Sequence, residues 1–245
     1  MRKFLIGFTL AALAIAPRIH AQTPVDLELA LLVDVSGSVD AGEFALQRDG
    51  YVNFFNNAGF WGANTRNVAV SLTYWSAGNQ QVSTAWYLVN NTASAGVFAA
   101  AITALPRTYS GNTAPGSAIN YAMGRWAGNG YTGKRRVIDV SGDGCQNTGS
   151  NTKAASDAAA AAKVTINGLP IGDGGCNLST WYTNNVITAD GFVTPAVSFA
   201  DFDKAVEAKI GREVGGGTVP EPASMTLLAT GLAGLAAARR RKKNA

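Results

Sequence analysis

The sequence predicts an α/β domain with a mainly parallel, doubly wound sheet, helices on both faces and one antiparallel edge strand. Short β-rich runs alternate with helical runs from Val25 to about Val214. Several of the β-rich runs are almost continuously apolar, which is typical of parallel strands that helices cover on both faces. Two others are joined by the short segment 76–80, which predicts an antiparallel hairpin at one edge of the sheet.

The first half of the domain contains the first buried strand and the hairpin. Residues 27–33 form an almost uninterrupted apolar run, so we expect a strand buried within the sheet. A helical pattern follows over about 42–58. Residues 68–75 and 81–89 are the predicted hairpin strands, and the Ala-rich run 94–105 is the predicted helix after them.

The second half alternates helices with two further buried strands. Helices are expected at about 116–126 and 152–163, and buried strands at 135–140 and 164–171. Residues 191–193 are expected to form a short final strand. A last helix is predicted because five apolar residues recur at helical spacing, namely Phe199, Phe202, Val206, Ile210 and Val214.

The N-terminus has the order of a secretory signal peptide. Two basic residues precede an apolar run over 4–16, and the small residue Ala21 follows. We expect residues 1–21 to be removed on export, with cleavage before Gln22. An N-terminal membrane anchor is the alternative, but the apolar run is shorter than a bilayer requires.

The composition changes abruptly after Val214. Residues 215–218 are expected to be a Gly-rich linker, and 219–245 contain a Pro-Glu-Pro motif, a short apolar run and five consecutive basic residues. This combination resembles the PEP-CTERM sorting tail. The resemblance implies that the apolar segment lies in the inner membrane of a bacterium until an exosortase-type enzyme processes the tail. The protein would then be displayed in the cell envelope, on the cell surface or in the extracellular matrix. A plain membrane anchor is the alternative.

The positive net charge does not indicate nucleic-acid binding. The chain has 20 Lys and Arg residues against 16 Asp and Glu, which gives a net charge of +4. Eight of the basic residues lie at the two ends, and the 12 that remain are fewer than the 16 acidic residues. A nucleic-acid-binding domain needs a basic face of its own, so no nucleic-acid partner is expected.

Histidine and cysteine usage excludes several catalytic classes. His20 is the single histidine in the sequence and lies within the predicted signal peptide. The exported chain would then lack Ser-His-Asp and Cys-His catalysis and every histidine metal site. Cys145 and Cys176 are the two cysteines, and an even pair in an exported protein is expected to form a disulfide.

Side chains that carry oxygen follow the ends of two buried strands. Asp34, Ser36 and Ser38 come directly after the first strand, and Asp143 follows the second. Thr113 lies in a glycine-flanked loop before a helix. The carboxyl ends of parallel strands share one edge of the sheet, which is where ligands bind in α/β folds. Hydroxyl and carboxylate oxygens suit a hard divalent cation, so the pattern predicts Mg²⁺, or Mn²⁺ or Ca²⁺ in its place.

These five residues resemble the metal-ion-dependent adhesion site (MIDAS) of von Willebrand factor type A (VWA) domains, which have a Rossmann-like fold. The resemblance implies that Ser36, Ser38 and Thr113 bind the metal directly, and that Asp34 and Asp143 bind it through water. It also implies that a carboxylate from a partner, either an acidic protein or a glycan, completes the metal coordination.

Two further sequence segments resemble one branch of these proteins. Residues 137–144 and 165–171 look similar to a bacterial branch, the DUF1194-like group. We expect the VWA-like domain to occupy residues 22–214. Taken alone, however, Asp-x-Ser-x-Ser also fits a helix N-cap or a turn that holds no metal.

Two other features have alternative interpretations. Asp139 lies in the middle of a predicted strand and could add a site carboxylate. An acid in this position is more often hydrogen-bonded within the structure, and it is not included in the predicted site. The tryptophans could stack on a sugar, although aromatic residues spread over many elements usually fill the core. They are Trp61, Trp75, Trp86, Trp126 and Trp181.

Together these features predict an exported binding or adhesion protein that is not an enzyme. It would hold a protein or glycan carboxylate through the metal at the predicted site. A structural role in the extracellular matrix, without metal-dependent binding, is the first alternative. A metal-dependent hydrolase is the second. It is disfavoured because the exported chain would have no histidine base and the sequence has no Gly-x-x-x-x-Gly-Lys-Ser/Thr phosphate loop.

Overall fold

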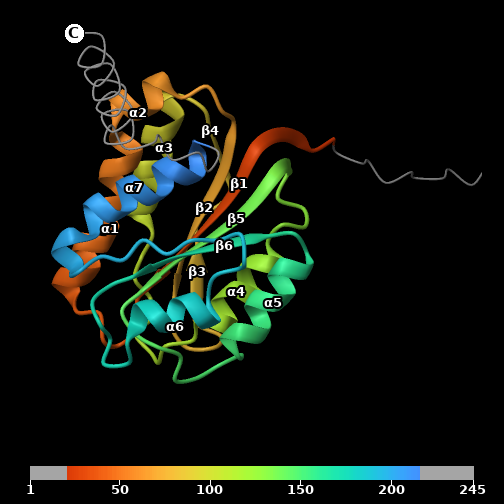
Figure 1. Ribbon diagram of the computed structural model, residues 1–245. Coiled ribbons are helices and arrows are strands. Elements are labelled where there is room, and N and C mark those ends of the chain that lie inside the picture. Colours follow the sequence, from red (N-terminus) through yellow and green to blue (C-terminus); the bar gives the residue numbers. More distant parts are fainter. Residues whose placement is uncertain (1–20, 216–245) are drawn as a thin grey trace, which may run out of the picture.

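The computed structural model describes residues 21–215 and contains a central sheet between two layers of helices (Figure 1). The predicted signal peptide up to residue 20, the linker beyond Gly215 and the predicted sorting tail lie outside the described residues. The strands are β1 (Thr23–Asp34), β2 (Val68–Trp75), β3 (Gln81–Ser83), β4 (Tyr87–Val89), β5 (Tyr131–Gly142) and β6 (Thr165–Pro170). The helices are α1 (Ala41–Asn56), α2 (Ala58–Ala63), α3 (Thr92–Ala104), α4 (Pro115–Gly124), α5 (Thr152–Ala161), α6 (Leu178–Asn185), the 3₁₀ turn η1 (Phe199–Asp201) and α7 (Phe202–Val214). Among these helices, none has the length and apolar character needed to cross a membrane.

The sheet is mainly parallel with an antiparallel edge, as the sequence predicts. Its strand order is β3-β2-β1-β5-β6, and β4 pairs with the beginning of β2. β1 pairs in parallel with both β2 and β5, and β5 pairs in parallel with β6. β3 and β4 run antiparallel to β2. The fold is therefore α/β with a mainly parallel sheet and one antiparallel edge.

Alternate residues of β1 supply the two halves of the hydrophobic core. Leu29 and Leu31 face the layer formed by α1, α2, α3 and α7. Ala30 and Leu32 face the layer formed by α4, α5 and α6. All four residues are buried, because helices cover the sheet on both sides. This two-sided burial explains why the apolar run of β1 is continuous rather than alternating.

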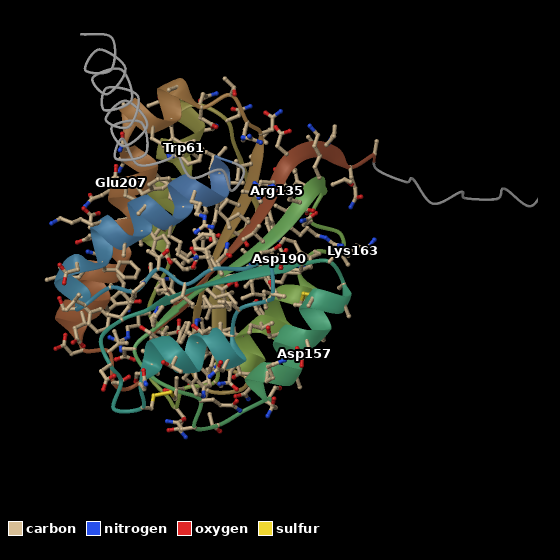
Figure 2. All side chains as sticks on the ribbon, viewed as in Figure 1. Trp61, Arg135, Asp157, Lys163, Asp190 and Glu207 are labelled. Carbon is tan, nitrogen blue, oxygen red and sulfur yellow. A yellow bond between two sulfur atoms is a disulfide. The ribbon has the colours of Figure 1, made fainter. Side chains whose placement is uncertain are left out.

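The tryptophans belong to the core rather than to a sugar-binding platform, because none of the five is exposed. Trp61 and Trp75 are fully buried, and the other three pack with the cluster beneath α4, α5 and α6. Figure 2 shows the contrast between Trp61, the buried residue of α2, and the charged Glu207, which lies at the surface of α7. The core-filling interpretation of the tryptophans therefore holds.

The predicted strand over 81–89 is divided into β3 and β4 by a β-bulge, which corrects the prediction of one continuous strand. The Thr84 hydroxyl accepts a hydrogen bond from the Leu72 N–H at 3.0 Å, and the Thr84 N–H donates to the Leu72 carbonyl at 2.9 Å. Ser83 pairs with Thr73 and Tyr87 pairs with Val70, so residues 84–86 lie opposite residues 71–72 of β2. This one extra residue is the bulge. The Thr84 hydroxyl thus accepts the hydrogen bond that a backbone carbonyl would accept in a regular pair of strands.

The segment 191–196 also differs from the prediction of a short strand over 191–193. Two isolated parallel bridges, Gly168 with Val193 and Ile171 with Ala196, attach this segment to the free edge of β6. The short helices α2 and α6 are further elements that the sequence pattern does not predict. Each has eight residues or fewer, too few for helical periodicity to show.

The order of strands changes direction between β1 and β5. From β1 the chain passes through α1 and α2 to β2 on one side, whereas β5 lies on the other side of β1. The loops that follow β1 and β5 therefore leave two neighbouring strands at the same edge of the sheet. In doubly wound sheets this switch point opens the crevice in which ligands bind.

Candidate metal site

The loop after β1 places one aspartate and two serines at the switch point. Asp34 is fully buried and Ser36 almost so, whereas Ser38 is exposed. Asp34 Oδ1 accepts a hydrogen bond from the Ser36 N–H at 2.7 Å, which fixes the turn that leads out of the strand. One carboxylate oxygen of Asp34 is therefore used within the loop, and the other remains available.

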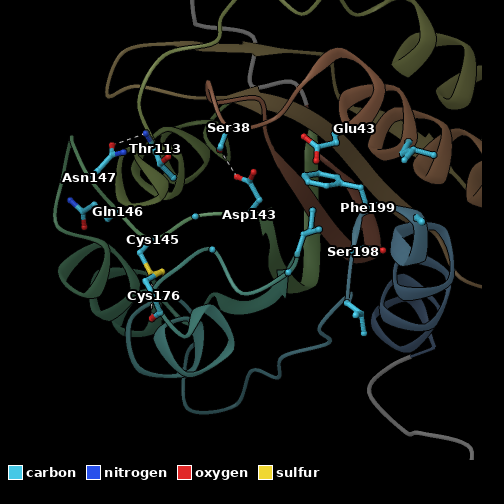
Figure 3. A pocket seen from close by; sticks show the side chains of 17 residues that line it. Ser38, Glu43, Thr113, Asp143, Cys145, Gln146, Asn147, Cys176, Ser198 and Phe199 are labelled. Atoms are coloured by element: carbon cyan, nitrogen blue, oxygen red, sulfur yellow. Dashed lines mark hydrogen bonds between the residues drawn. A yellow bond between two sulfur atoms is a disulfide. The ribbon is translucent and has the colours of Figure 1, made fainter.

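The other two predicted residues reach the same point from separate loops (Figure 3). Thr113, in the loop before α4, donates from its hydroxyl to Ser36 Oγ at 3.4 Å. The Oγ atoms of Ser36 and Ser38 lie 3.2 Å apart. Ser38 donates to Oδ1 of Asp143, in the loop after β5, at 2.7 Å. The structure thus joins four of the five predicted residues in one chain of contacts, and Asp34 joins it through the backbone of Ser36.

The second carboxylate oxygen of Asp34 is buried without a hydrogen-bond donor. Its Oδ2 atom has no partner within residues 21–215. Burial raises the pKa of Asp34 to about 7; the Ser36 N–H lowers it and the charge of Asp143 raises it. A buried carboxylate oxygen that lacks a donor is costly, and a cation with its bound water would satisfy it. The orphaned oxygen and the all-oxygen donor set therefore fit a hard divalent metal.

Gly142 is needed because Asp34 approaches the backbone of β5 closely. A Cβ atom on residue 142 would lie 2.8 Å from Asp34 Oδ2 and 2.9 Å from Tyr182 Oη. Neither of these two buried oxygens has a partner among the described residues. A side chain at position 142 would therefore displace the carboxylate from its place under the site.

Arg107 and Gln47 hold the loop after β1, and the sequence pattern does not identify either of them. Arg107 donates to four backbone carbonyl groups of the segment 35–40, at 2.5 to 3.3 Å. Gln47, on α1, donates to the Asp34 carbonyl at 3.0 Å. No motif could have revealed these two residues, because the carbonyl groups that they contact are the same in every amino acid.

The Cys145–Cys176 disulfide is present, as predicted, and begins two residues after Asp143, in the loop that follows β5. It joins this loop to the segment just before α6. Within that segment Gly174 has a φ of +59°, and a Cβ atom there would lie 2.6 Å from the carbonyl oxygen of Asp143. The bridged segment therefore lies directly against the backbone of Asp143 and supports it.

The same loop also holds Thr113 in place. Asn147 accepts a hydrogen bond from the Thr113 N–H through its side chain at 2.8 Å. The Asn147 N–H in turn donates to the Thr113 carbonyl at 3.0 Å. The loop after β5, which carries Asp143, Cys145 and Asn147, thus positions both Asp143 and Thr113. Asn147 is a contributor that sequence reasoning missed, since its position in a loop gave no signal.

An open groove of about 950 Å³ begins at the site (Figure 3). Ser38, Thr113 and Asp143 form part of its wall. Farther along, the wall includes apolar side chains, of which Leu46 is 46% and Val197 is 85% exposed. The groove therefore offers polar oxygens at one end and uncovered apolar surface beside them.

The chemistry of the site is that of neutral hydroxyls backed by two carboxylates. Residues 21–215 contain no histidine and no group of three or more His, Cys, Asp or Glu side chains placed to hold a metal. Asp139 stands apart from the constellation, because it pairs with Lys209 of α7 at 2.5 Å. Asp139 is therefore not one of the side chains that meet at the candidate site.

Comparisons with known proteins agree with the fold and with the C-terminal motif. A family model described as "Protein of unknown function (DUF1194)" matches residues 24–218. The PEP-CTERM protein-sorting motif matches residues 218–242. No curated protein matches the chain.

Several solved structures resemble the domain. Proximal thread matrix protein 1 (PTMP1) of the mussel byssus has a TM-score of 0.60 at 15% identity, over 79% of this chain and 49% of that one. A PTMP1 structure with a zinc-occupied MIDAS motif has a TM-score of 0.58 at 15% identity, over 80% and 47%. The vWF domain of the type V pilus tip protein Mfa5 from Porphyromonas gingivalis has a TM-score of 0.55 at 11% identity, over 80% and 98%. This chain spans about half the length of PTMP1. At these identities the likeness shows a VWA-like fold.

Proposed function

Because this chain belongs to the DUF1194 family and carries a PEP-CTERM sorting motif, we propose that it is an exported adhesion-type protein that holds a ligand carboxylate through a divalent metal. The observation that carries the proposal is the convergence of five oxygen-bearing residues at the switch point of the sheet. Four of them contact one another, and the fifth, Asp34, has a buried oxygen with no partner in the described chain.

The hydroxyls and the carboxylates would have different roles. Ser36, Ser38 and Thr113 would bind the metal directly, whereas Asp34 and Asp143 would bind through water. With neutral hydroxyls as the direct protein ligands, the cation keeps its attraction for an anionic group. Mg²⁺ is the proposed metal, with Mn²⁺ or Ca²⁺ as substitutes, because all three prefer oxygen. The metal supplies the positive charge that a ligand carboxylate needs at the mouth of the groove.

The groove favours an acidic polypeptide over an anionic glycan as the ligand. Leu46 and Val197 leave apolar surface beside the polar wall, and a polypeptide can place an apolar side chain next to an acidic one. Among the described residues, no tryptophan lines this groove, and its aromatic residue Phe199 packs against the hydrophobic core. An exosortase-type enzyme is the second proposed partner, and it would act on the PEP-CTERM tail.

A metal titration tests the proposal. Purified protein is stripped with a chelator, and its Tm is measured as Mg²⁺ or Mn²⁺ is added. At a metal concentration of about 100 times the Kd, binding adds about 2.7 kcal/mol, which corresponds to a rise in Tm of about 5 to 10 °C for a domain of this size. We expect the Ser36→Ala and Asp143→Asn variants to lose this rise, because each removes one proposed ligand.

Two matched variants control for unspecific effects of substitution and of salt. Ser179→Ala and Asp157→Asn make the same chemical changes on α6 and α5, at positions whose side chains are not part of the proposed site. Both should respond to the metal as the unchanged protein does. An unchanged protein whose Tm does not respond to either cation would rule the proposal out.

A metal-independent structural role in the extracellular matrix is the alternative, and the PEP-CTERM motif motivates it. It predicts that the cations have no effect on Tm and that Asp143→Asn has no effect on function, so the same titration separates the two roles. We propose no catalytic activity. The structures that resemble the domain include a byssus matrix protein and a pilus tip domain, and residues 21–215 provide no histidine base.

A further inference from the structure

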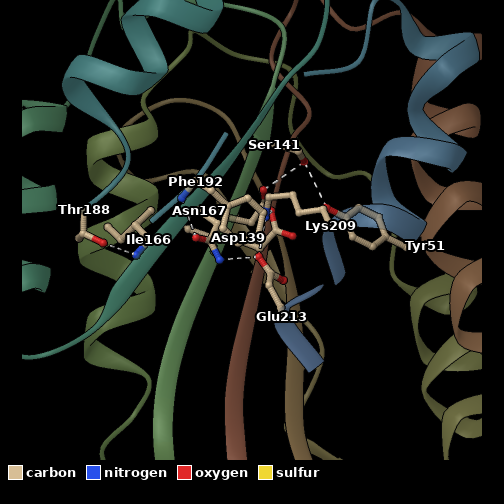
Figure 4. A network of polar contacts seen from close by, with 10 residues as sticks. Tyr51, Asp139, Ser141, Ile166, Asn167, Thr188, Phe192, Lys209 and Glu213 are labelled. Atoms are coloured by element: carbon tan, nitrogen blue, oxygen red, sulfur yellow. Dashed lines mark hydrogen bonds and ion pairs between the residues drawn. The ribbon is translucent and has the colours of Figure 1, made fainter. Parts of the chain in front are cut away.

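A fully buried cluster of charged side chains joins the last helix to the middle of the sheet (Figure 4). Asp139 lies on β5, and Lys209 and Glu213 lie one turn apart on α7. The Lys209 Nζ atom is 2.5 Å from Asp139 Oδ1 and 2.8 Å from Glu213 Oε1. Each of the three side chains is at most 1% exposed. The metal site makes no use of them.

The cluster contains one ammonium and two carboxyl groups. One ionised carboxylate would balance the ammonium, so the second carboxyl group is in excess. Burial raises the pKa of Asp139 to about 7; the Lys209 ammonium lowers it and the charge of Glu213 raises it. Two guanidinium groups lie near the cluster: that of Arg135 donates to the Glu213 backbone carbonyl at 2.7 Å, and that of Arg212 stacks on the Phe192 ring at 3.7 Å. Among the described residues, neither donates to the Glu213 carboxylate. Tyr51, which faces the cluster from α1, is itself an acid and adds no positive charge. The pKa of Asp139 is thus raised into the range where its neutral, protonated form is populated near neutral pH.

Neighbouring residues hold Glu213 beside the amine. Asn167, on β6, donates from its amide to Glu213 Oε1 at 2.8 Å. The Asn167 Oδ1 atom accepts from the Phe192 N–H at 3.1 Å, which fixes the direction of the amide. The ring of Phe192 lies 5.8 Å from Lys209 Nζ. The Lys209 amino group, the Asp139 carboxyl and the Glu213 carboxylate, which can carry a proton between them, are therefore in contact within the core.

We propose that Lys209 and Asp139 condense to an amide that links α7 covalently to β5. The Lys209 ammonium gives one proton to Glu213, and the amine nitrogen attacks Cγ of Asp139, so that a C–N bond forms. The bond between Cγ and the Asp139 hydroxyl oxygen breaks. This oxygen takes a nitrogen proton, relayed through Glu213, and leaves as water. No oxidant, reductant or other reactant is consumed.

The reaction removes the charge that burial disfavours. Lys209 and Glu213 begin as a buried ion pair, and the products are a neutral amide and a neutral Glu213. The loss of two buried charges favours the products, because each buried ion carries a desolvation cost. A cavity of about 220 Å³, lined by Asn167 and Glu213 and bordered by the exposed Asp190, gives the water a path out.

The amide would fasten the helix nearest the C-terminal tail to a central strand. Residues 139 and 209 are 70 positions apart, so the link closes a large part of the domain. A pull on the C-terminal end of the domain would then reach the sheet through covalent bonds rather than through the packing of α7. This inference rests on the cluster alone and does not depend on the proposed metal site.

Peptide mapping of the folded full chain tests the link. The protein is reduced, alkylated and digested with trypsin. We expect residues 137–153 joined to residues 205–212 in one branched species, lighter than the sum of the two peptides by one water. Cleavage after Lys209 should be absent, because its side chain is an amide. Free 205–209 together with unmodified 137–153 would overturn the proposal, as would a link from Lys209 to Glu213.

Three variants test the chemistry. Glu213→Gln removes the proton carrier, and we expect linkage to slow by about 100-fold or more. Glu207→Gln makes the same change at an exposed position of α7 and should link as the unchanged chain does. Asp139→Asn keeps the carbon and offers ammonia as the leaving group, so its branched species should have the same mass as that of the unchanged chain. Circular dichroism confirms that each variant is folded. Undiminished linkage in Glu213→Gln, or none in a folded Asp139→Asn, would contradict the mechanism.

Discussion

At the residue scale, the site depends on a close approach between the Asp34 carboxylate and the backbone of β5. Asp34 Oδ1 is bound by its own loop, whereas Oδ2 is buried against Gly142. The position of this one carboxylate relative to the hydroxyls is therefore set by two strands at once. A small displacement of either strand would therefore move the Asp34 carboxylate.

Substitution of Gly142 by alanine tests this dependence. The new Cβ atom would lie 2.8 Å from Asp34 Oδ2, so the backbone or the carboxylate must shift. We expect a loss of about 1 to 3 kcal/mol in the free energy of unfolding, together with a smaller rise in Tm on addition of metal. Chemical denaturation with and without Mg²⁺ measures both effects.

Gly124→Ala is the matched control. A Cβ atom there meets nothing within 4 Å, and the residue ends α4, so alanine should be neutral or should stabilise by up to about 1 kcal/mol. A Gly142→Ala protein with unchanged stability and unchanged metal response would show that Asp34 is not held as the structure describes.

The pH dependence of metal binding follows from Asp34. The metal requires its carboxylate, and burial raises the pKa of this group to about 7 in the metal-free chain. Protons therefore compete with the metal, and the metal affinity should fall as the pH drops from 8 to 5, by up to about tenfold per pH unit. Titration calorimetry at several pH values measures this trend.

The stability of the metal-free protein should change in the opposite sense. The folded chain keeps a proton on Asp34 that the unfolded chain loses at its ordinary pKa of 3.8. The contribution of this residue to stability is thus lost as the pH rises from about 4 to 7. Asp34→Asn should remove the contribution of this residue to both trends, and a metal affinity that does not vary with pH would contradict them.

The residues of the proposed metal site were easier to find in the sequence than the residues that support them. Asp34, Asp143 and the three hydroxyl residues share a recognisable spacing relative to buried strands. Arg107 and Gln47 contact backbone carbonyls, for which the sequence has no code. Gly174 is needed only because a distant carbonyl lies 2.6 Å from where its Cβ atom would be.

At the scale of elements, the strands at the centre of the sheet were the easiest to predict. β1 is buried on both faces, and its continuous apolar run reflects that burial directly. At the edge, the run over 81–89 has the composition of one strand, but the Thr84 side chain bonds to β2 and a bulge results. Burial is visible in the sequence as a run of apolar residues, whereas a single side-chain hydrogen bond leaves no such pattern.

The Cys145–Cys176 bridge connects the loop after β5, which carries Asp143, to the segment before α6. Replacement of both Cys145 and Cys176 by serine should lower the free energy of unfolding by about 3 to 4 kcal/mol, from the entropy of the opened loop. It should also weaken metal binding, because the segment containing Gly174 supports the Asp143 backbone. Denaturation and metal titration measure the two effects.

Reduction of the unchanged protein provides the control for this double variant. Treatment with a reducing agent should reproduce both losses without any change of sequence. A double variant as stable as the parent, with the same metal affinity, would show that the bridge supports neither the domain nor the site.

At the scale of the whole molecule, the alternation of apolar and helical runs was enough to predict a doubly wound sheet and the edge at which the five candidate residues meet. The buried cluster of Asp139, Lys209 and Glu213 was not predictable. Its members are far apart in the sequence, and two of them lie on a helix whose pattern gives no sign of a partner in β5. Only the packing of α7 against the sheet brings them together.

The central claim is that the five residues at the switch point bind one divalent cation. The most direct test is a crystal structure of the protein soaked in Mn²⁺, with anomalous scattering to locate the ion. We expect a single ion in contact with the hydroxyl oxygens of Ser36, Ser38 and Thr113, with Asp34 and Asp143 joined to it through water. An anomalous map with no ion at these hydroxyls would contradict the account.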